Sequence, residues 1–538
     1  MIYRGLVVCI ALLWAVAAGS AAREPATKAP IPPEVDPVAS LDIIYRRTDV
    51  SGERLELGLT DVIELALRNN FDIQIERLNV PINELAAIEE RAVFDPVFGT
   101  LFNYRQSVIQ AVTALQGAPI PEERKYDLDF SLGQALPTGG SYTFLFENER
   151  LRTNNIFVPL DPRYDVWIRL DISQPLLRDF GIDVNTTSIR QAENEIKIAE
   201  ESYRGQMIDA IANAINTYWE LVYTIMDLQV REVSLSQAMQ LLEENRAKFK
   251  AGTLPRTDVL QAEAGVANRR TNILLIRAII ENTEDQLKQA LNIEAERGPE
   301  AWDLPIAPQT PPAVVDIDVT PEHSLELARH FRPDYQQFLL AVDNDEIELR
   351  YRRNQLWPDL NLRVSGQLAG VGGTPRPDAI IDENVGRGYR AAFDNATSGK
   401  YYSLEAGVML EIPLGNRARK SAFRAAKLEL RQRKLEFERF KQEILVEVRR
   451  AIRQLRTARA EIRSTDILRK AQWKKLQAER RRYEVGKTTS FEVLIFQEQF
   501  AVAQRQYVRS VIGYNQAFVN LQRAQGTLLK HLNIQVTY

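Results

Sequence analysis

The chain has 538 residues, of which 45% are hydrophobic and 26% are charged, and these proportions are typical of a folded protein. Its 68 basic and 72 acidic residues give a net charge of −4, so the overall charge does not favour a nucleic-acid partner. Cys9 is the only cysteine, and there are three histidines. Disulfide scaffolds, cysteine-ligated zinc sites and most enzyme classes are thereby disfavoured, and we expect neither a bound metal nor a cofactor.

Residues 1–21 have the layout of a secretory signal peptide. Arg4 precedes an apolar core from Leu6 to Ala18, and small residues follow it. The core of about 13 residues is shorter than the ~20 that a membrane-spanning helix needs, so a transmembrane anchor is the less favoured alternative. Residues 22–56 are rich in proline and are predicted to form an extended tether.

Two proline-bounded parts of the chain, 97–174 and 359–412, alternate apolar and polar residues with a period of two. The individual runs have about ten residues, the length of a tilted transmembrane β-strand. Half-buried strands of a soluble sheet show the same local pattern and are the alternative. No segment after the leader has 18 consecutive apolar residues, so a chain that enters a membrane must do so as a closed β-barrel.

Very long helices are predicted where proline is absent, between Pro175 and Pro255 and after Pro413. From Ile189 to Leu228, apolar residues recur every three or four positions, which is the pattern of a coiled-coil seam. A helix from about Thr187 to Lys250 would be ~96 Å long at 1.5 Å per residue. Such a helix is typical of a tubular or rod-like protein.

The two halves of the chain match each other at one constant offset over their first parts. The matching residues are Glu64-Leu65-Ala66 with Glu326-Leu327-Ala328, Asp72 with Asp334, and Pro96 with Pro358. We therefore divide the chain into repeat 1 (57–292), a linker (293–320) and repeat 2 (321–538). Each repeat is predicted to contain a helix, strands and a long helical hairpin, with hairpin tips near 252–258 and 486–492. Internal duplication of this kind is typical of pseudo-symmetric assembly around an axis.

Motifs of catalysis and nucleotide binding are missing from the sequence. Glu484 to Thr489 resembles the end of a phosphate-binding loop, but Arg481 stands where the loop requires glycine. The helix predicted from about Arg417 to Arg482 is strongly basic and could by itself bind nucleic acid. An exported protein meets no genome, so we expect no nucleic-acid partner. Because the catalytic motifs are missing, we expect no enzyme activity.

This order of elements resembles the TolC-like outer-membrane efflux protein family. The resemblance is carried by Gln174-Pro175-Leu176-Leu177 at a strand end and by two Phe/Tyr-x-x-Gly tips, each followed by Asp/Glu-Val-Leu, and it covers about Leu57 to Leu529. It implies an α+β membrane protein, a homotrimer whose β-barrel lies in the lipid of the cell outer membrane. Its long helices would form a coiled-coil tunnel that extends into the periplasm.

The resemblance also implies the function and the site. The protein would be a passive exit duct for tripartite efflux or type I secretion, docked by a periplasmic adaptor (membrane fusion) protein and powered by an inner-membrane pump. Tyr483 takes the position of a gate tyrosine, Thr257 and Asp258 take those of its partners, and Glu492 takes one acidic position of a constriction ring. The adaptor would contact the exposed tips, namely Gly252, Thr253, Leu254, Gly486, Lys487 and Thr488.

The sequence departs from the usual pattern of two strands per repeat. In repeat 1, two further alternating runs, about 126–136 and 141–150, flank the turn-forming residues Pro137 to Gly140. Because each strand set must begin and end at the periplasmic helices, its number of strands must be even. We predict four strands in repeat 1 and two in repeat 2, hence six per protomer and eighteen per trimer. A hairpin of 126–150 folded over the extracellular mouth is the alternative.

A second protein class also fits the sequence and is the alternative to the channel. A periplasmic coiled-coil adaptor or scaffold protein without a membrane barrel would share the export signal and the long helices.

Overall fold

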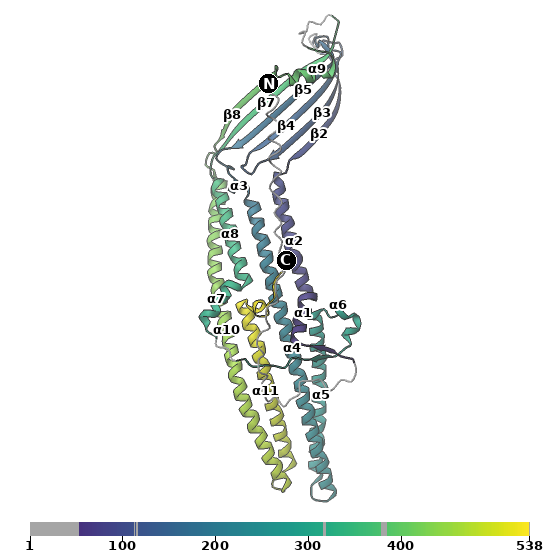
Figure 1. Ribbon diagram of the computed structural model, residues 1–538, viewed down its shortest axis with the longest axis vertical. Helices are drawn as coiled ribbons and strands as arrows, with labels where there is room; N and C mark the ends of the chain where they lie inside the picture. The colour runs from purple at the N-terminus through teal and green to yellow at the C-terminus, as the bar shows by residue number, and fades with distance from the viewer. Residues whose placement is uncertain (1–52, 112, 114–116, 316–318, 378–384, 537–538) are drawn as a thin grey trace, which may run out of the picture.

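The computed structural model describes residues 53–111, 113, 117–315, 319–377 and 385–536. The molecule is elongated: a sheet lies at one end, and long helices run from it to the other end (Figure 1). The predicted signal peptide (1–21) and most of the predicted tether (22–56) fall outside the described residues.

Six strands form one antiparallel sheet, in the order β2-β3-β4-β5-β7-β8. The strands are β2 (Val97–Val108), β3 (Glu122–Ala135), β4 (Ser141–Thr153), β5 (Leu160–Pro175), β7 (Asp359–Pro375) and β8 (Tyr402–Glu411). Repeat 1 thus supplies four strands and repeat 2 supplies two, which confirms the prediction of six per chain. The alternative of a hairpin folded over the mouth is wrong, because β3 and β4 are paired continuously between β2 and β5.

The turn between β3 and β4 lies at the helical end of the sheet, as predicted. The main-chain oxygen of Thr138 accepts from the Gly181 amide at 3.1 Å and from the Gln174 side chain at 3.2 Å, which ties the turn to the start of the long helices. Gly139 has φ +89°, and a Cβ there would collide with the main-chain oxygen of Asp179. Glycine is therefore required at this position.

Strand register gives the sheet one apolar face and one polar face. The apolar face combines alternate residues of all six strands, among them Phe98, Phe102, Leu128, Leu132, Phe144, Ile168, Leu170, Ile172, Leu362, Val364, Leu404, Val408 and Leu410. Much of this face is exposed in the single chain; Tyr402 and Leu404 are 72% and 74% exposed. The opposite face is polar and holds ion pairs such as Arg169 with Glu147 at 3.0 Å and Lys125 with Glu149 at 2.7 Å.

A short helix, α9 (Gly388–Thr397), lies between β7 and β8 and was not predicted from the sequence. It packs on the apolar face, with Ala392 and Ala396 fully buried against Val166 of β5. The approach is possible because β7 carries glycine beneath the helix: a Cβ on Gly370 would collide with the main chain of Ala392 and Ala396. The helix lies at the end of the sheet that is remote from the long helices (Figure 1).

The helices repeat in the two halves of the chain. Repeat 1 has α1 (Leu59–Asn69), α2 (Phe71–Arg91), α4 (Thr187–Lys250) and α5 (Arg256–Leu291), and repeat 2 has α7 (Pro321–Phe331), α8 (Pro333–Asn354), α10 (Arg417–Glu484) and α11 (Ser490–Gln525). The bounds of α4 are those predicted from the apolar seam and the missing prolines. Short helices α3 (Ile182–Asn185), α6 (Glu294–Arg297) and α12 (Leu528–His531) complete the set. Within the described residues, no helix is both long enough and apolar enough to cross a bilayer.

The main hydrophobic core lies midway along the helices. It surrounds α4 and includes a two-stranded parallel sheet of β1 (Leu55–Leu57) and β6 (Ile306–Pro308). Tyr218 of α4 is fully buried there. Its hydroxyl donates to the main-chain oxygen of Leu57 at 3.4 Å and accepts from the amide of Thr310 at 3.0 Å. Parts of the predicted tether and linker are thus fixed side by side on α4.

The packing of α9 gives a direct test of the fold. Gly370→Ala places a methyl group against the backbone of α9, and such overpacking costs roughly 1–3 kcal/mol. We expect α9 to detach, so that trypsin cleaves more rapidly after Arg387 and Arg390. Gly366→Ala is the matched control in the same strand, because its nearest neighbour would be Leu404 at 4.0 Å. Equal cleavage of both variants would contradict the observed packing.

Candidate functional site: the tips of the helical hairpins

The two hairpin tips are built in the same way. Gly252 and Gly486 have φ +72° and +70°, and each follows the last turn of a long helix. The next residue then bonds back to that turn: Thr253 donates to the Lys248 oxygen at 3.0 Å, and Lys487 donates to the Arg482 oxygen at 2.8 Å. This is the glycine-dependent helix ending that allows the chain to reverse within a few residues.

Tyr483 joins the two hairpins near their tips. Only 5% of the residue is exposed, and its hydroxyl donates to Oδ1 of Asn245 on α4 at 2.5 Å. Asn245 is fully buried, and its amide group donates to the main-chain oxygen of Asp258 on α5 at 3.3 Å. The Lys248 ammonium lies 3.7 Å from the centre of the tyrosine ring. Three helices therefore meet at one buried polar contact.

Only some of the residues in this contact were predicted from the sequence. Tyr483 bonds across to the first hairpin, but the side-chain acceptor is Asn245, and Asp258 contributes its main-chain oxygen. Thr257 is exposed and lies outside the contact. Asn245 follows Ala238, Leu241 and Leu242 on the buried side of α4. An isolated asparagine on an apolar seam was the signal that could have identified it.

The remaining predicted residues lie at the surface of the tips. Glu492 is exposed, and its amide donates to the hydroxyl of Thr489, which caps the N-terminus of α11. Gly252, Thr253, Gly486 and Lys487 are exposed, while Leu254 and Thr488 are half-buried. These six residues are available for contact with another protein.

Burial keeps the hydroxyl of Tyr483 in its protonated form. Removal of the ring from water raises the pKa of Tyr483, and the nearby carboxylates of Glu244 and Asp258 raise it further. The hydroxyl is therefore a hydrogen-bond donor throughout the neutral pH range. Apolar residues of both hairpins pack around it, including Leu241, Val266, Val493 and Leu494.

Further polar contacts join the hairpins along their length, from the tips to the level of the core and beyond it. Together with the Tyr483–Asn245 bond we call them the polar ladder, and its other members are Arg269 with Glu498 at 3.6 Å, Arg509 with Glu220 at 2.6 Å and Arg523 with Asp209 at 2.6 Å. Arg269 is also bound to the Ser234 hydroxyl at 2.9 Å. Burial lowers the pKa of Arg269, and the charge of Glu498 opposes this shift.

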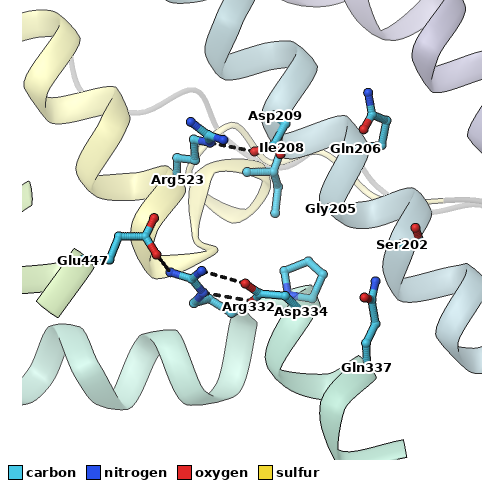
Figure 2. Close-up of a pocket in the computed structure, with 11 residues that line it drawn as sticks. Ser202, Gly205, Gln206, Ile208, Asp209, Arg332, Asp334, Gln337, Glu447 and Arg523 are labelled. Carbon is cyan, nitrogen blue, oxygen red and sulfur yellow. Dashed lines mark hydrogen bonds and ion pairs between the residues drawn. The ribbon is translucent and has the colours of Figure 1, made fainter. Parts of the chain in front are cut away.

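At the end of the ladder remote from the tips, an arginine joins three helices of repeat 2, namely α7, α8 and α10. Arg332 lies between α7 and α8, and Figure 2 shows it between Asp334 and Glu447. It donates twice to Asp334, at 3.0 and 2.6 Å, and once to Glu447 of α10, at 2.6 Å. Burial opposes the charge of Arg332, but the two carboxylates outweigh it and raise the pKa. These bonds join the junction of α7 and α8 to α10.

The hairpin tips provide hydrogen bonds, charged side chains and exposed residues, but the described residues there form no catalytic site. Within the described ranges, no group of three or more His, Cys, Asp or Glu side chains is placed to hold a metal ion.

Comparison with known proteins agrees with this architecture. The sequence matches the outer membrane efflux protein family over residues 168–292 and 325–527, which is more than half of the chain. No curated protein sequence gives a significant match.

Solved structures share the fold at low sequence identity. The Campylobacter jejuni outer membrane channel CmeC is 16% identical, with a TM-score of 0.61, and the match covers 87% of this chain and 86% of CmeC. The Vibrio cholerae outer membrane protein VceC is also 16% identical, with a TM-score of 0.61 and coverage of 87% and 96%. The open state of the Neisseria gonorrhoeae outer membrane channel MtrE is 15% identical, with a TM-score of 0.56 and coverage of 94% and 99%.

The sheet, the paired helical hairpins and these matches lead to one assignment. The chain belongs to the outer membrane efflux protein family and is an efflux exit duct of the outer membrane that extends into the periplasm.

Proposed function

We propose that three copies of this chain close into one barrel and one tunnel, gated at the hairpin tips. The observation that carries the proposal is the sheet itself. Its apolar face is uncovered over most of its area, and within the described residues β2 and β8 each lack a partner strand on their outer side. All ten residues of β8 are exposed in the single chain. In hydrocarbon these edges must be paired, and pairing β8 with β2 of the next copy satisfies both at once.

The helices support the same assembly. On α2, five large apolar residues are each more than half exposed and follow a heptad-like spacing: Phe71, Ile75, Leu78, Ile82 and Leu85. On α10, Leu428 and Leu435 are exposed and lie one heptad apart. Such stripes are typical of helices that pack against another helix in a coiled coil. In a ring of three copies, helices of one protomer would cover those of the next, and six strands per copy would give a barrel of eighteen.

Gating follows from the difference between the two ends of the hairpins. The core around Tyr218 and the Arg332 contact fix the upper end, whereas the tips are held together by few polar bonds. The closed tip would open when the Tyr483–Asn245 bond breaks and the second hairpin moves away from the first. An adaptor that binds the exposed tip residues could favour the open form by binding it more tightly.

The partners follow from the same geometry. The tip residues Gly252, Thr253, Leu254, Gly486, Lys487 and Thr488 would meet a periplasmic adaptor protein, and an inner-membrane pump would supply the energy. Tripartite efflux and type I secretion both fit such a duct. A coiled-coil scaffold without a barrel is disfavoured, because it leaves the apolar face of the sheet in water.

Lipid contact can be tested with a pair of neighbouring residues in β8. Leu404→Lys puts a charge on the apolar face, which costs roughly 2–4 kcal/mol near the bilayer midplane. Ser403→Lys puts the same charge on the polar face. We expect Leu404→Lys to lower the temperature at which the oligomer dissociates on gels, and Ser403→Lys to leave it nearly unchanged. Similar behaviour of the two variants would contradict a lipid-facing apolar side.

The gate can be tested by removing one hydroxyl. Tyr483→Phe leaves the buried amide oxygen of Asn245 without its donor, at a cost of roughly 1–3 kcal/mol per copy. The closed tip should be destabilised, so we expect conductance in planar bilayers to rise several-fold, and Asn245→Ala should act likewise. Tyr507→Phe is the control, because its ring contact with Arg469 survives the substitution. The gate assignment fails if Tyr483→Phe and Asn245→Ala both conduct like the wild type.

The pH dependence of the gate has a definite sign. Because the pKa of Tyr483 is raised, its bond to Asn245 is present below the ordinary tyrosine pKa of about 10 and is lost only as pH rises through the raised value. Conductance of the wild type should therefore not rise between about pH 7 and pH 9. An increase within that range would mean that another group controls the tips.

A further inference from the structure

On the apolar face of the sheet, aliphatic residues and phenylalanines give way to tyrosines towards the end that carries α9. Nearer the helices it is apolar, with Leu132 and Phe144 opposite each other. Further along the same strands come tyrosines at Tyr104, Tyr126 and Tyr164, and Tyr389 of α9 lies beside them. Rows of aromatic residues are typical of the membrane–water interface of outer-membrane barrels. The tyrosine row therefore marks where hydrocarbon gives way to lipid headgroups.

Arginines occupy the same face at and beyond the tyrosine row. Arg150 of β4 lies between two rings, with its guanidinium carbon 5.6 Å from the centre of Tyr126 and 5.9 Å from that of Tyr164. Its Nε is buried and has no hydrogen-bond partner among the described residues. Arg124 and Arg152 face each other on the adjacent pair of positions, and about half of each side chain is exposed.

Helix α9 adds to this surface. Tyr389 stacks edge-on against Tyr164 and donates to Asn148 of β4 at 2.7 Å, which fixes the helix beside Arg150. Phe393 of the same helix is partly exposed, and Arg390 has a side chain that is 93% exposed. Phe393 packs edge-on against Phe146 of β4, and the highly exposed Arg390 side chain adds a cation to the same helix.

The acidic residues nearby do not cancel the arginines. Arg124 pairs with Glu122 at 2.6 Å, Arg152 lies 3.9 Å from Asp161, and Arg390 lies 3.8 Å from Asp394. These three pairs are neutral but partly exposed, and exposed pairs are weak enough to exchange for a stronger anion. Arg150 forms no ion pair among the described residues, so its positive charge is not neutralised.

We propose that Arg124, Arg150 and Arg152, together with α9, bind the phosphorylated headgroup of an outer-leaflet lipid. The inference rests on the proposed function, because it requires the apolar face to contact the membrane. Guanidinium groups suit phosphate because they present a planar fork of donors that matches two phosphate oxygens. The lipid chains would lie on the apolar strands below, while Tyr389 and Phe393 would sit at the level of the headgroup. The contact would anchor the barrel at a fixed depth.

The test measures lipid binding to the purified full-length oligomer by native mass spectrometry. The probes are bis-phosphorylated lipid A, the same lipid without its phosphates, and inorganic phosphate. We expect the wild type to prefer the phosphorylated lipid, and Arg124→Gln with Arg152→Gln to weaken its binding roughly tenfold or more. The control is Arg105→Gln with Arg363→Gln, which removes the same charge from the polar face and should leave binding unchanged. Arg150→Lys, which keeps the charge but loses the fork, should bind more weakly than the wild type.

The outcomes separate this inference from the proposed function. If the oligomer binds both lipids equally, or if Arg124→Gln with Arg152→Gln binds like the wild type, the headgroup site is wrong while the duct stands. If millimolar inorganic phosphate displaces the lipid fully, the site binds a free anion, and the lipid assignment is overturned. If only the polar-face control loses binding, the sheet faces the opposite way, and the proposed barrel fails with it.

Discussion

The unpaired edges of the sheet are the constraint on which the rest of the structure depends. A strand edge exposes main-chain N–H and C=O groups, and hydrocarbon offers nothing to bond them. In this chain β2 and β8 each present such an edge, beside a face of large apolar side chains. A single copy is therefore incomplete in a membrane. In the proposed assembly, further copies would pair with both edges, and the helices beneath the sheet would then form a ring as well.

In the proposed ring, the helical part is where the structure would open. Duplication gives each protomer two hairpins of equal design, joined by the polar ladder and by a core at mid-length. The member of the ladder nearest the tips is the bond from the buried hydroxyl of Tyr483 to Asn245. A buried hydrogen bond contributes only about 1 kcal/mol, so three of them can be opposed by the binding of a partner protein. The proposed duct would thus combine a fixed barrel with a movable tip.

Features that repeat along the sequence could be predicted, whereas features that depend on contacts between distant residues could not. The period of two predicted six strands, and missing prolines with an apolar seam predicted the bounds of α4. Helix α9 was missed because it exists only against Gly370 and its neighbours on β7, far away in the chain. Asn245 was missed because its role depends on Tyr483, which belongs to the other repeat.

A structure of the protein in a lipid nanodisc by electron cryomicroscopy tests the central claim most directly. The number of strands around the barrel and the order in which they pair would be counted. The account predicts three copies and eighteen strands, with β8 of each copy hydrogen-bonded to β2 of the next. A barrel of twelve strands with β3 and β4 outside its wall, or a sheet whose β2 and β8 edges remain unpaired, would contradict it.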